Sequence, residues 1–319
     1  MIKKYCLCCL NELGDEEKSL DFHKKCLKKF FGTVQAPQIE LNDDVLEVLA
    51  EKSSAMGVSV AGVQKKLSLH LLSKKNEQPR LTLIGFPQGY ILKPQSADYQ
   101  FLPETEQITM VMAEKVGVQV VPHSFIYISN HSLSYITKRI DRLENGDKIH
   151  MEDFCQLSGR LTEDKYKGSY EQCAKIIQKY SARPGIDLTD FFYRLLFCFV
   201  TGNSDMHLKN FSLIHNQQSG EWELARAYDL LPVNILMPSD KEETALTMNG
   251  KKSRLTRKDF LIFAQNIKIP LKAAEKMIER LVSKKDVLLE VAKSPFISDE
   301  LQTNFCSLIE ERCGRLMKD

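Results

Sequence analysis

The sequence predicts an α+β protein whose first part is β-rich and whose second part is mainly helical. Three short β-type runs lie between residues 59 and 94, and polar or Gly/Pro-bearing joints separate them: VQKKLSLHLL, RLTLIG and YILKP. From about Glu152 the pattern becomes mostly helical. The 319 residues, 43% of them hydrophobic and 27% charged, are sufficient for one large two-lobed globular domain.

The remaining elements of the first part follow in order. The three runs are typical of a small antiparallel sheet. The next segment, PETEQITMVMAEKVGV, has Ile108, Met112 and Val116 at helical spacing and ends near Gly117, which predicts one amphipathic helix. Two more strands are expected from HSFIYI and LSYITKRID, and an extended joint near 138–142 leads into the second part.

The second part should be built around a buried helix, because DLTDFFYRLLFCFVTG is apolar nearly all round. Further on, IPLKAAEKMIERLVSKKDVLLEVAK has one apolar face that includes Leu271, Ala274, Ile278 and Leu281. Between these helices, FSLIH and ELARAYDL flank the turn NQQSGEW and predict a hairpin. A β-rich lobe, an extended joint and a helical lobe with an embedded hairpin make up the layout of a protein-kinase-like fold.

We expect three regions: a Cys-rich segment at 1–45 that packs on the N-lobe, the N-lobe at 46–141 and the C-lobe at 142–319. The net charge of +2 gives no global reason to expect direct nucleic-acid binding. No apolar run approaches the roughly 20 residues that cross a bilayer, and the N-terminus lacks a secretion signal. We therefore expect a cytoplasmic protein with no membrane contact and with reduced, mostly buried cysteines.

The candidate catalytic residues follow the buried helix, where the apolar run breaks at Thr201-Gly202. Phosphoryl transfer from ATP needs positioning, Mg²⁺ and a carboxylate near the attacking hydroxyl. Asp205 and Asn210 have the +5 spacing of the catalytic Asp and metal-binding Asn of kinases, and Asp229 follows the hairpin as a second metal-binding Asp would. A solvated turn is the alternative. Two carboxylates in apolar surroundings favour a metal site, because burying a carboxylate without a metal or hydrogen-bond donor would cost several kcal/mol.

Two upstream features could bind phosphate. Gly62, in VSVAGVQKK, could let backbone N–H groups approach phosphate oxygens, with Lys66 as a countercharge, although an ordinary turn is the alternative. Lys93 lies on an apolar strand ahead of the helix that carries Glu104 and Glu106. Kinases pair such a lysine with a helix glutamate, whereas a solvent-facing lysine is the simpler interpretation.

Six stretches together resemble the successive motifs of HipA-type serine/threonine kinases, the toxins of bacterial HipA–HipB systems. These stretches are SVAGVQKK, ILKP, ITKRIDR, MEDFCQLSG, TGNSDMHLKNFSL and AYDLLP. The resemblance runs from about Val58 to about Leu281. It implies a HipA-like kinase fold that uses ATP and Mg²⁺.

The resemblance also implies roles for individual residues. Asp205 would be the catalytic base, Asn210 and Asp229 would bind Mg²⁺, and Ser59 would be the loop serine whose autophosphorylation switches the kinase off. The implied nucleotide contacts are Ala61, Gly62, Val63, Gln64, Lys65, Lys66, Lys93, Lys138, Arg139, Ile140, His207, Leu208, Lys209, Asn210, Tyr228 and Asp229. Lys138 and Ile140 depart from long HipA chains, which have a glutamate and an aromatic residue in this hinge.

Only about 57 residues precede the phosphate loop, so the chain looks most like HipT, the compact toxin of three-gene HipBST systems. This resemblance implies a small HipS-like partner, a HipB-like DNA-binding antitoxin and an aminoacyl-tRNA synthetase substrate, with the tryptophanyl enzyme preferred. One alternative is a small-molecule kinase of the aminoglycoside or choline type, which Asp205, His207 and Asn210 also fit. Another is a nucleotide-binding pseudokinase that acts as an interaction module.

The N-terminal segment carries a separate candidate metal site. Cys6, Cys9, His23 and Cys26 follow the pattern C-x2-C, thirteen residues, H-x2-C, and three thiolates with an imidazole suit one tetrahedral Zn²⁺. Cys8 offers a rival register. The alternative is a reduced, metal-free helical hairpin that packs on the sheet.

Overall fold

A computed structural model of the chain describes residues 3–39, 66–73, 77–83, 89–128, 132–143 and 145–318. It divides into two compact units. The first comprises Met1–Gln107 and Val121–Lys148, and the second comprises Ile108–Val120 and Ile149–Asp319. The boundary between the two units at Gln107 and Ile108 falls within helix α3 (Leu102–Val116).

A six-stranded sheet with the order β1-β3-β2-β4-β6-β5 forms the first unit. The strands are β1 (Gln38–Ile39), β2 (Leu67–Leu72), β3 (Arg80–Thr82), β4 (Tyr90–Lys93), β5 (His123–Tyr127) and β6 (Leu133–Lys138). Neighbouring strands are antiparallel except β1, which is parallel to β3. The antiparallel sheet expected from the sequence is confirmed. Strand β1 was not predicted, because two residues are too few for a periodic pattern.

The N-terminal segment packs on strand β4 of this sheet. Short helix α1 (Lys24–Phe30) buries Cys26, Leu27 and Phe30, and the Phe30 carbonyl accepts a hydrogen bond from the Tyr90 hydroxyl of β4 at 3.3 Å. The Phe30 and Phe31 rings both pack against the Tyr90 ring. Within residues 3–39, the part of this segment that the structure describes, α1 is the one helix.

Helices make up most of the second unit, with a three-stranded sheet in the order β7-β8-β9. Its strands are β7 (Met151–Asp153), β8 (Ser212–His215) and β9 (Trp222–Leu224). Its α-helices are α4 (Phe154–Leu157), α5 (Tyr170–Tyr180), α6 (Pro184–Thr201), α7 (Val233–Leu236), α8 (Arg257–Asn266), α9 (Leu271–Val282), α10 (Lys285–Ala292) and α11 (Asp299–Met317), and two 3-10 turns are η1 (Thr162–Asp164) and η2 (Leu208–Asn210).

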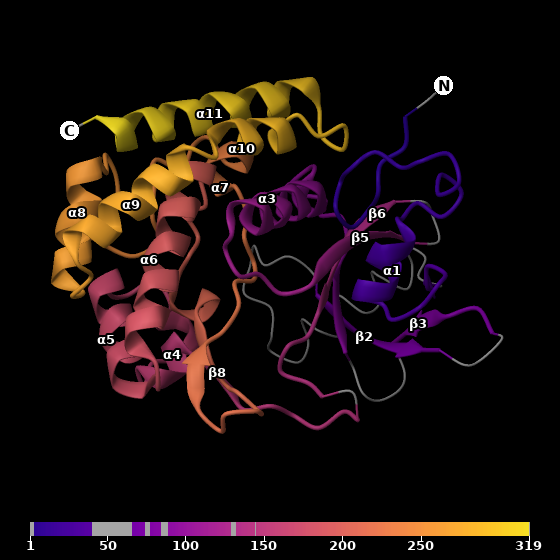
Figure 1. Cartoon of the computed structure of the whole chain (residues 1–319), viewed down its shortest axis with the longest axis horizontal. Coiled ribbons are helices and arrows are strands. Elements are labelled where there is room, and N and C mark those ends of the chain that lie inside the picture. The colour runs from indigo at the N-terminus through magenta and orange to yellow at the C-terminus, as the bar shows by residue number, and fades with distance from the viewer. Residues whose placement is uncertain are drawn as a thin grey trace. The chain divides into compact units, whose positions relative to one another are not determined.

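Helix α6 is the core of the second unit, as its nearly uniform apolarity predicts. It packs against α5, α9 and α11 (Figure 1). The rings of Phe192 and Phe199 contact Phe260 of α8, and Phe191 contacts Phe211 beside the hairpin. The residues that follow α6 are therefore anchored on a rigid helix.

Several expectations for the second part are refined. The hairpin is confirmed as β8 and β9, but β7 adds a third strand at the point where the pattern predicted helix, because Glu152 pairs with Leu213 of β8. The long amphipathic stretch is broken into α9 and α10 around Ser283. Among the described helices, none has both the length and the apolar composition needed to cross a bilayer. All nine cysteines are free, and most are buried.

Candidate functional site

The polar loop singled out in the sequence begins where helix α6 ends. Gly202 caps the helix with φ 74° and ψ 28°. A Cβ added there would lie 2.5 Å from Leu308 Cδ2 and 3.3 Å from Asn234 Cβ. Both the left-handed backbone and the close packing therefore require glycine, and they fix the direction in which the loop leaves the helix.

Asp205 is half-buried and is held from three sides. The Tyr166 hydroxyl donates a hydrogen bond to Asp205 Oδ1 at 2.7 Å, and the Asp205 N–H donates to Asn203 Oδ1 at 3.2 Å. The Asn210 side-chain amide donates to the Asp205 carbonyl at 2.8 Å, so the structure brings together these two predicted residues. Burial and the hydrogen bond to Asp205 raise the pKa of Tyr166, so this phenol remains a donor at neutral pH.

The middle of the loop rests on the segment that carries Tyr166. The buried His207 imidazole packs edge-to-face on the Tyr166 ring, with ring centroids 5.0 Å apart. The Tyr170 hydroxyl donates to the Met206 carbonyl at 3.1 Å. These contacts orient His207 and stiffen the loop on either side of it.

Turn η2 closes the loop. The Leu208 N–H donates to the Lys165 carbonyl at 3.1 Å. Lys209 Nζ pairs with Asp153 Oδ2 at 2.9 Å, at the end of β7. Lys209, which is predicted to contact nucleotide phosphates, is thus already paired with a carboxylate. A phosphate would have to displace Asp153 or bind Lys209 together with it.

Asp229 follows the β8–β9 hairpin, as predicted, and is half-buried with φ 59°. This left-handed conformation costs an aspartate on the order of 1 kcal/mol, and such outliers concentrate at functional sites. The hydroxyl of the preceding Tyr228 donates to the Lys209 carbonyl at 3.1 Å and lies 2.5 Å from the Ser212 hydroxyl. Tyr228 therefore ties the chain next to Asp229 to the loop that carries Asn210.

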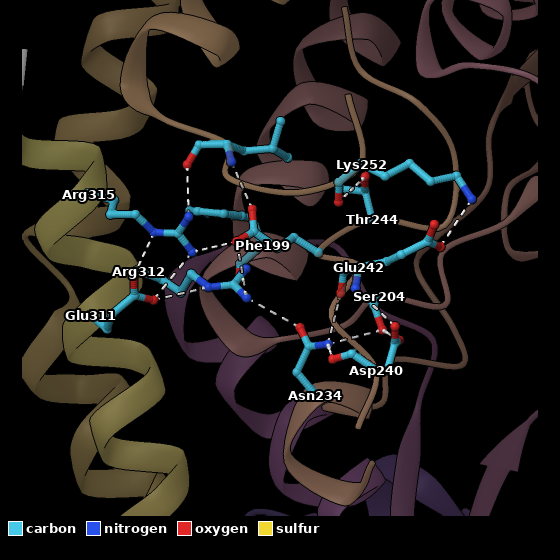
Figure 2. A network of polar contacts seen from close by, with 12 residues as sticks. Phe199, Ser204, Asn234, Asp240, Glu242, Thr244, Lys252, Glu311, Arg312 and Arg315 are labelled. Carbon is cyan, nitrogen blue, oxygen red and sulfur yellow. Dashed lines mark hydrogen bonds and ion pairs between the residues drawn. The ribbon is translucent and has the colours of Figure 1, made fainter. Parts of the chain in front are cut away.

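A polar network supports the base of the loop from the C-terminal helix (Figure 2). The Ser204 hydroxyl donates to Asp240 Oδ2 at 2.7 Å, and the Asn234 N–H donates to the Gly202 carbonyl at 2.9 Å. Arg312 of α11 donates to Asn234 Oδ1 at 3.4 Å. Gly202 and Ser204 are therefore held by Asn234 and Asp240, and Arg312 in turn contacts Asn234.

A buried ion pair stands out in the first unit. Lys93 Nζ lies 2.5 Å from Glu106 Oε1, and the two residues are 3% and 0% exposed. The expected pairing of a strand lysine with a helix glutamate is confirmed, and the alternative of a solvent-facing lysine is wrong. Glu104 instead accepts a hydrogen bond from Gln95 at 2.6 Å.

The predicted hinge lies at the end of β6. The Lys138 N–H donates to the Pro122 carbonyl at 2.9 Å, and the Arg139 N–H donates to the Gly89 carbonyl at 2.8 Å. These two backbone donors are used within the chain, so hydrogen bonds to adenine would have to come from other backbone groups of this stretch, which ends at Ile140.

The other predicted residues fall into two groups. Ser59 and the loop residues Ala61, Gly62, Val63, Gln64 and Lys65 lie outside the described residues, while Lys66 is exposed directly before β2. At the N-terminus the structure brings together Cys6, Cys9, His23 and Cys26.

The family model of the HipA-like C-terminal domain matches residues 58–287 of this sequence. The chain belongs to this HipA-like family. The match contains Lys93, Asp205, Asn210 and Asp229, and it agrees closely with the range over which the motifs resembled HipA-type kinases. Helix α11, which supports the loop through Arg312, lies beyond it.

Three curated relatives of this HipA-like chain are named as kinases by inference. Y4mE of Sinorhizobium fredii is 30% identical over 236 residues, which cover 70% of this chain and 54% of that protein. A protein of Haemophilus influenzae is 26% identical over 280 residues, which cover 78% of this chain and 79% of that protein. The chain spans about half the length of the two Sinorhizobium relatives that it matches, 54% of Y4mE and 48% of Y4dM.

Solved structures confirm the α+β kinase-like fold. The HipA-like chain matches HipA of Shewanella oneidensis, solved with HipB and operator DNA, with a TM-score of 0.66 and 22% identity over 81% of this chain and 64% of that chain. It also matches the Helicobacter pylori proinflammatory kinase CtkA, with a TM-score of 0.54 and 15% identity over 79% of this chain and 98% of that chain. At these identities the likeness shows the fold alone.

The oxygen atoms of Asp205, Asn210 and Asp229 are of the chemical type that suits the Mg²⁺ a kinase fold implies. Asn210 uses its amide nitrogen to bond the Asp205 carbonyl, which leaves its Oδ1 as an acceptor. Asp205 and Asp229 supply carboxylates, and Mg²⁺ prefers oxygen ligands of this kind. The HipA-like domain therefore has a suitable donor set in its second unit.

Several supporting residues of this site were not found from the sequence. Tyr166 contacts Asp205 from 39 positions upstream, and Arg312 of α11 contacts Asn234, which bonds the Gly202 carbonyl. No spacing rule links such distant positions, so only the tertiary structure reveals these contacts.

Proposed function

We propose that this HipA-like chain is an ATP- and Mg²⁺-dependent serine/threonine protein kinase. In this proposal Lys93 binds the α- and β-phosphates, and Asn210 and Asp229 hold Mg²⁺, which neutralises phosphate charge when bound. Asp205 accepts the proton of the attacking hydroxyl. Two contacts support these roles: the buried ion pair of Lys93 in the first unit, and the hydrogen bond between Asn210 and the Asp205 carbonyl in the second.

The buried Lys93–Glu106 pair is the observation that carries the proposal. Burying two charges costs several kcal/mol per ion, so such a pair contributes little net stability compared with apolar side chains. Its value is that Glu106 holds the Lys93 ammonium in one fixed orientation. A kinase needs this orientation to bind phosphates.

The biological role that we propose is that of a toxin of the HipBST type. The sequence resemblance to HipT supports it, and the Shewanella HipA structure is a complex with HipB and operator DNA. By analogy, the partners of this chain would be a HipB-like DNA-binding antitoxin and a small HipS-like protein. The substrate would be an aminoacyl-tRNA synthetase, with the tryptophanyl enzyme preferred, whose phosphorylation stops translation.

Autophosphorylation of Ser59 is proposed as the regulatory step. Ser59 lies next to the predicted phosphate loop in the sequence. A phosphoserine carries a charge of roughly −1.5 to −2, so it would repel ATP from a phosphate pocket. A Ser59→Ala variant should therefore stay active and become more toxic to cells.

A substrate panel tests the proposed reaction. The purified chain is incubated with labelled ATP, Mg²⁺ and each of a set of purified synthetases, and parallel reactions contain an aminoglycoside or choline. We expect label on a synthetase, which Asp205→Ala abolishes while the exposed carboxylate variant Glu290→Gln retains it.

The other outcomes separate the alternatives. Label on the small molecules would indicate a small-molecule kinase. ATP binding without any transfer, together with growth inhibition that persists in Asp205→Ala, would indicate a pseudokinase that acts by binding.

A further inference from the structure

Three thiols and one imidazole converge in the N-terminal segment. The Sγ atoms of Cys6, Cys9 and Cys26 and a ring nitrogen of His23 all lie within 4.8 Å of one another. In a tetrahedral zinc site with Zn–S distances near 2.3 Å, the sulfur atoms are about 3.8 Å apart. Small side-chain movements would therefore place these four atoms around one ion.

The hydrogen bonds of His23 select the nitrogen that faces the thiols. His23 Nε2 lies 3.2 Å from the Glu12 carbonyl, which can only accept, so Nε2 carries the proton. The lone pair is then on Nδ1, which lies 3.4 Å from Cys9 Sγ. A zinc-bound nitrogen and sulfur are about 3.5 Å apart, and zinc-binding histidines typically donate their other N–H to a carbonyl or carboxylate.

The cluster is also enclosed and shaped as a binding site. Cys6 and Cys26 are buried, and Cys6 Sγ accepts a hydrogen bond from the His23 N–H at 3.3 Å. A tight turn returns the chain from Cys6 to Cys9, with Leu10 N–H bonded to the Cys6 carbonyl at 2.9 Å. All of these cysteines are free thiols, so no disulfide competes for the sulfur atoms.

The charge around the cluster suits a bound ion. Three thiolates and Zn²⁺ leave a net charge of −1. Helix α1, which carries Cys26, also carries the exposed lysines Lys24, Lys25, Lys28 and Lys29. The Glu17 carboxylate lies 3.9 Å from His23 Nε2, so it is close enough to orient the imidazole as carboxylates do beside zinc-binding histidines.

We propose that Cys6, Cys9, His23 and Cys26 bind one structural Zn²⁺. Protein ligands occupy all four coordination positions of the ion, so its role is to hold the segment together and not to take part in a reaction. It joins the turn at Cys6–Cys9 to helix α1, which has seven residues.

The same segment supports the start of helix α3. The Gln107 side-chain amide donates to the Cys8 carbonyl at 2.7 Å, and its oxygen lies 2.8 Å from His123 Nδ1 of β5. The Leu7 carbonyl accepts from the Phe125 N–H at 2.9 Å. Because Gln107 follows Glu106, the zinc-bound turn supports the part of α3 that holds the Lys93 ion pair.

Metal analysis of the full chain tests the site. Protein prepared without a metal-affinity tag and without chelator should contain one zinc per chain. Cys9→Ser and Cys26→Ser should lose most of it. Cys8→Ser is the matched control, because Cys8 Sγ donates to the His123 carbonyl at 3.7 Å and lies outside the four-atom cluster, although it also interacts with Cys26.

A second measurement on the wild-type chain guards against variants that fail to fold. Removing the metal with a strong chelator should lower the Tm by about 5 °C or more, and adding zinc should restore it. Replacing zinc with Co²⁺ should give the visible absorption of a tetrahedral, thiolate-rich site, which Cys8→Ser retains.

Wild-type protein without zinc, or with disulfides among these cysteines, would overturn the proposal. Loss of zinc in Cys8→Ser but not in Cys9→Ser would overturn the assigned ligand set. These readouts do not involve ATP, so they are independent of the proposed kinase activity.

Discussion

Replacing the buried Lys93–Glu106 pair separates its effect on stability from its effect on nucleotide binding. At 2.5 Å the gross attraction is about 6–7 kcal/mol for an effective dielectric constant of 20. Desolvation of the two ions, several kcal/mol each, offsets most of it. The net contribution of the pair to the free energy of unfolding should therefore be close to zero.

Single and double variants should differ sharply for this reason. Lys93→Met or Glu106→Leu alone removes the 2.5 Å ion pair while the other charge stays buried, and should lower the free energy of unfolding by about 3–5 kcal/mol. The double variant removes both charges and should return to within about 1 kcal/mol of the wild type or exceed it. Urea unfolding measures these differences, with the exposed Lys115→Met as a control that should change stability by less than about 0.5 kcal/mol.

Nucleotide binding should not recover in the double variant. It lacks the Lys93 ammonium, so calorimetry with Mg-ATP should show an affinity about 10–150-fold weaker than that of the wild type, the equivalent of one charged hydrogen bond. Wild-type affinity in a stable double variant would refute the phosphate-binding role of Lys93. A double variant no more stable than either single variant would refute the cost assigned to the unpaired charge.

Three further predictions concern other parts of the structure. Gly202→Ala should lower the free energy of unfolding by about 2–4 kcal/mol in urea titrations, because it adds a Cβ in a left-handed, tightly packed position, and an unchanged value would contradict that account. Tyr166→Phe keeps the ring but removes the phenol hydrogen bond that competes with a substrate hydroxyl for Asp205 Oδ1, so steady-state phosphotransfer should rise about 2–10-fold, whereas a fall would indicate that the phenol positions the loop. Burial and the charge of Lys29 lower the pKa of His123 to about 3. The neutral imidazole therefore contributes fully to the free energy of unfolding above the unfolded pKa near 6.5, and this contribution is lost as pH falls towards 3. Stability should decrease by about 2 kcal/mol at pH 5 from this group, and His123→Gln should flatten that part of the pH profile.

Local patterns in the sequence were enough to predict most of the fold. Strands β2 to β6 and helix α3 were predicted because each has a clear alternating or helical period over several residues. Helix α6 was predicted from its continuous apolar run and its glycine stop. Strand β1 was missed because it has only two residues, and β7 was missed because it is defined by its pairing with the distant strand β8.

The candidate site was predictable where its residues lie close together in the sequence. Asp205 and Asn210 are five residues apart, and their hydrogen bond follows from that spacing. Lys93 and Glu106 were found because a charge on an apolar strand is unusual. Tyr166 and Arg312 were not predicted, because their contacts with Asp205 and Asn234 join segments that are far apart in the sequence.

Phosphoryl transfer by Asp205 is the central claim, and one measurement tests it most directly. The purified chain and its Asp205→Asn variant are incubated with ATP and Mg²⁺, and phosphorylation of each is followed by mass spectrometry. We predict that the wild type gains a phosphoryl group on Ser59 and that Asp205→Asn, folded and still binding ATP, gains none. Equal phosphorylation of the two proteins would contradict the assignment of Asp205 as the catalytic base, and no phosphorylation of either protein or of any added substrate would contradict the kinase activity itself.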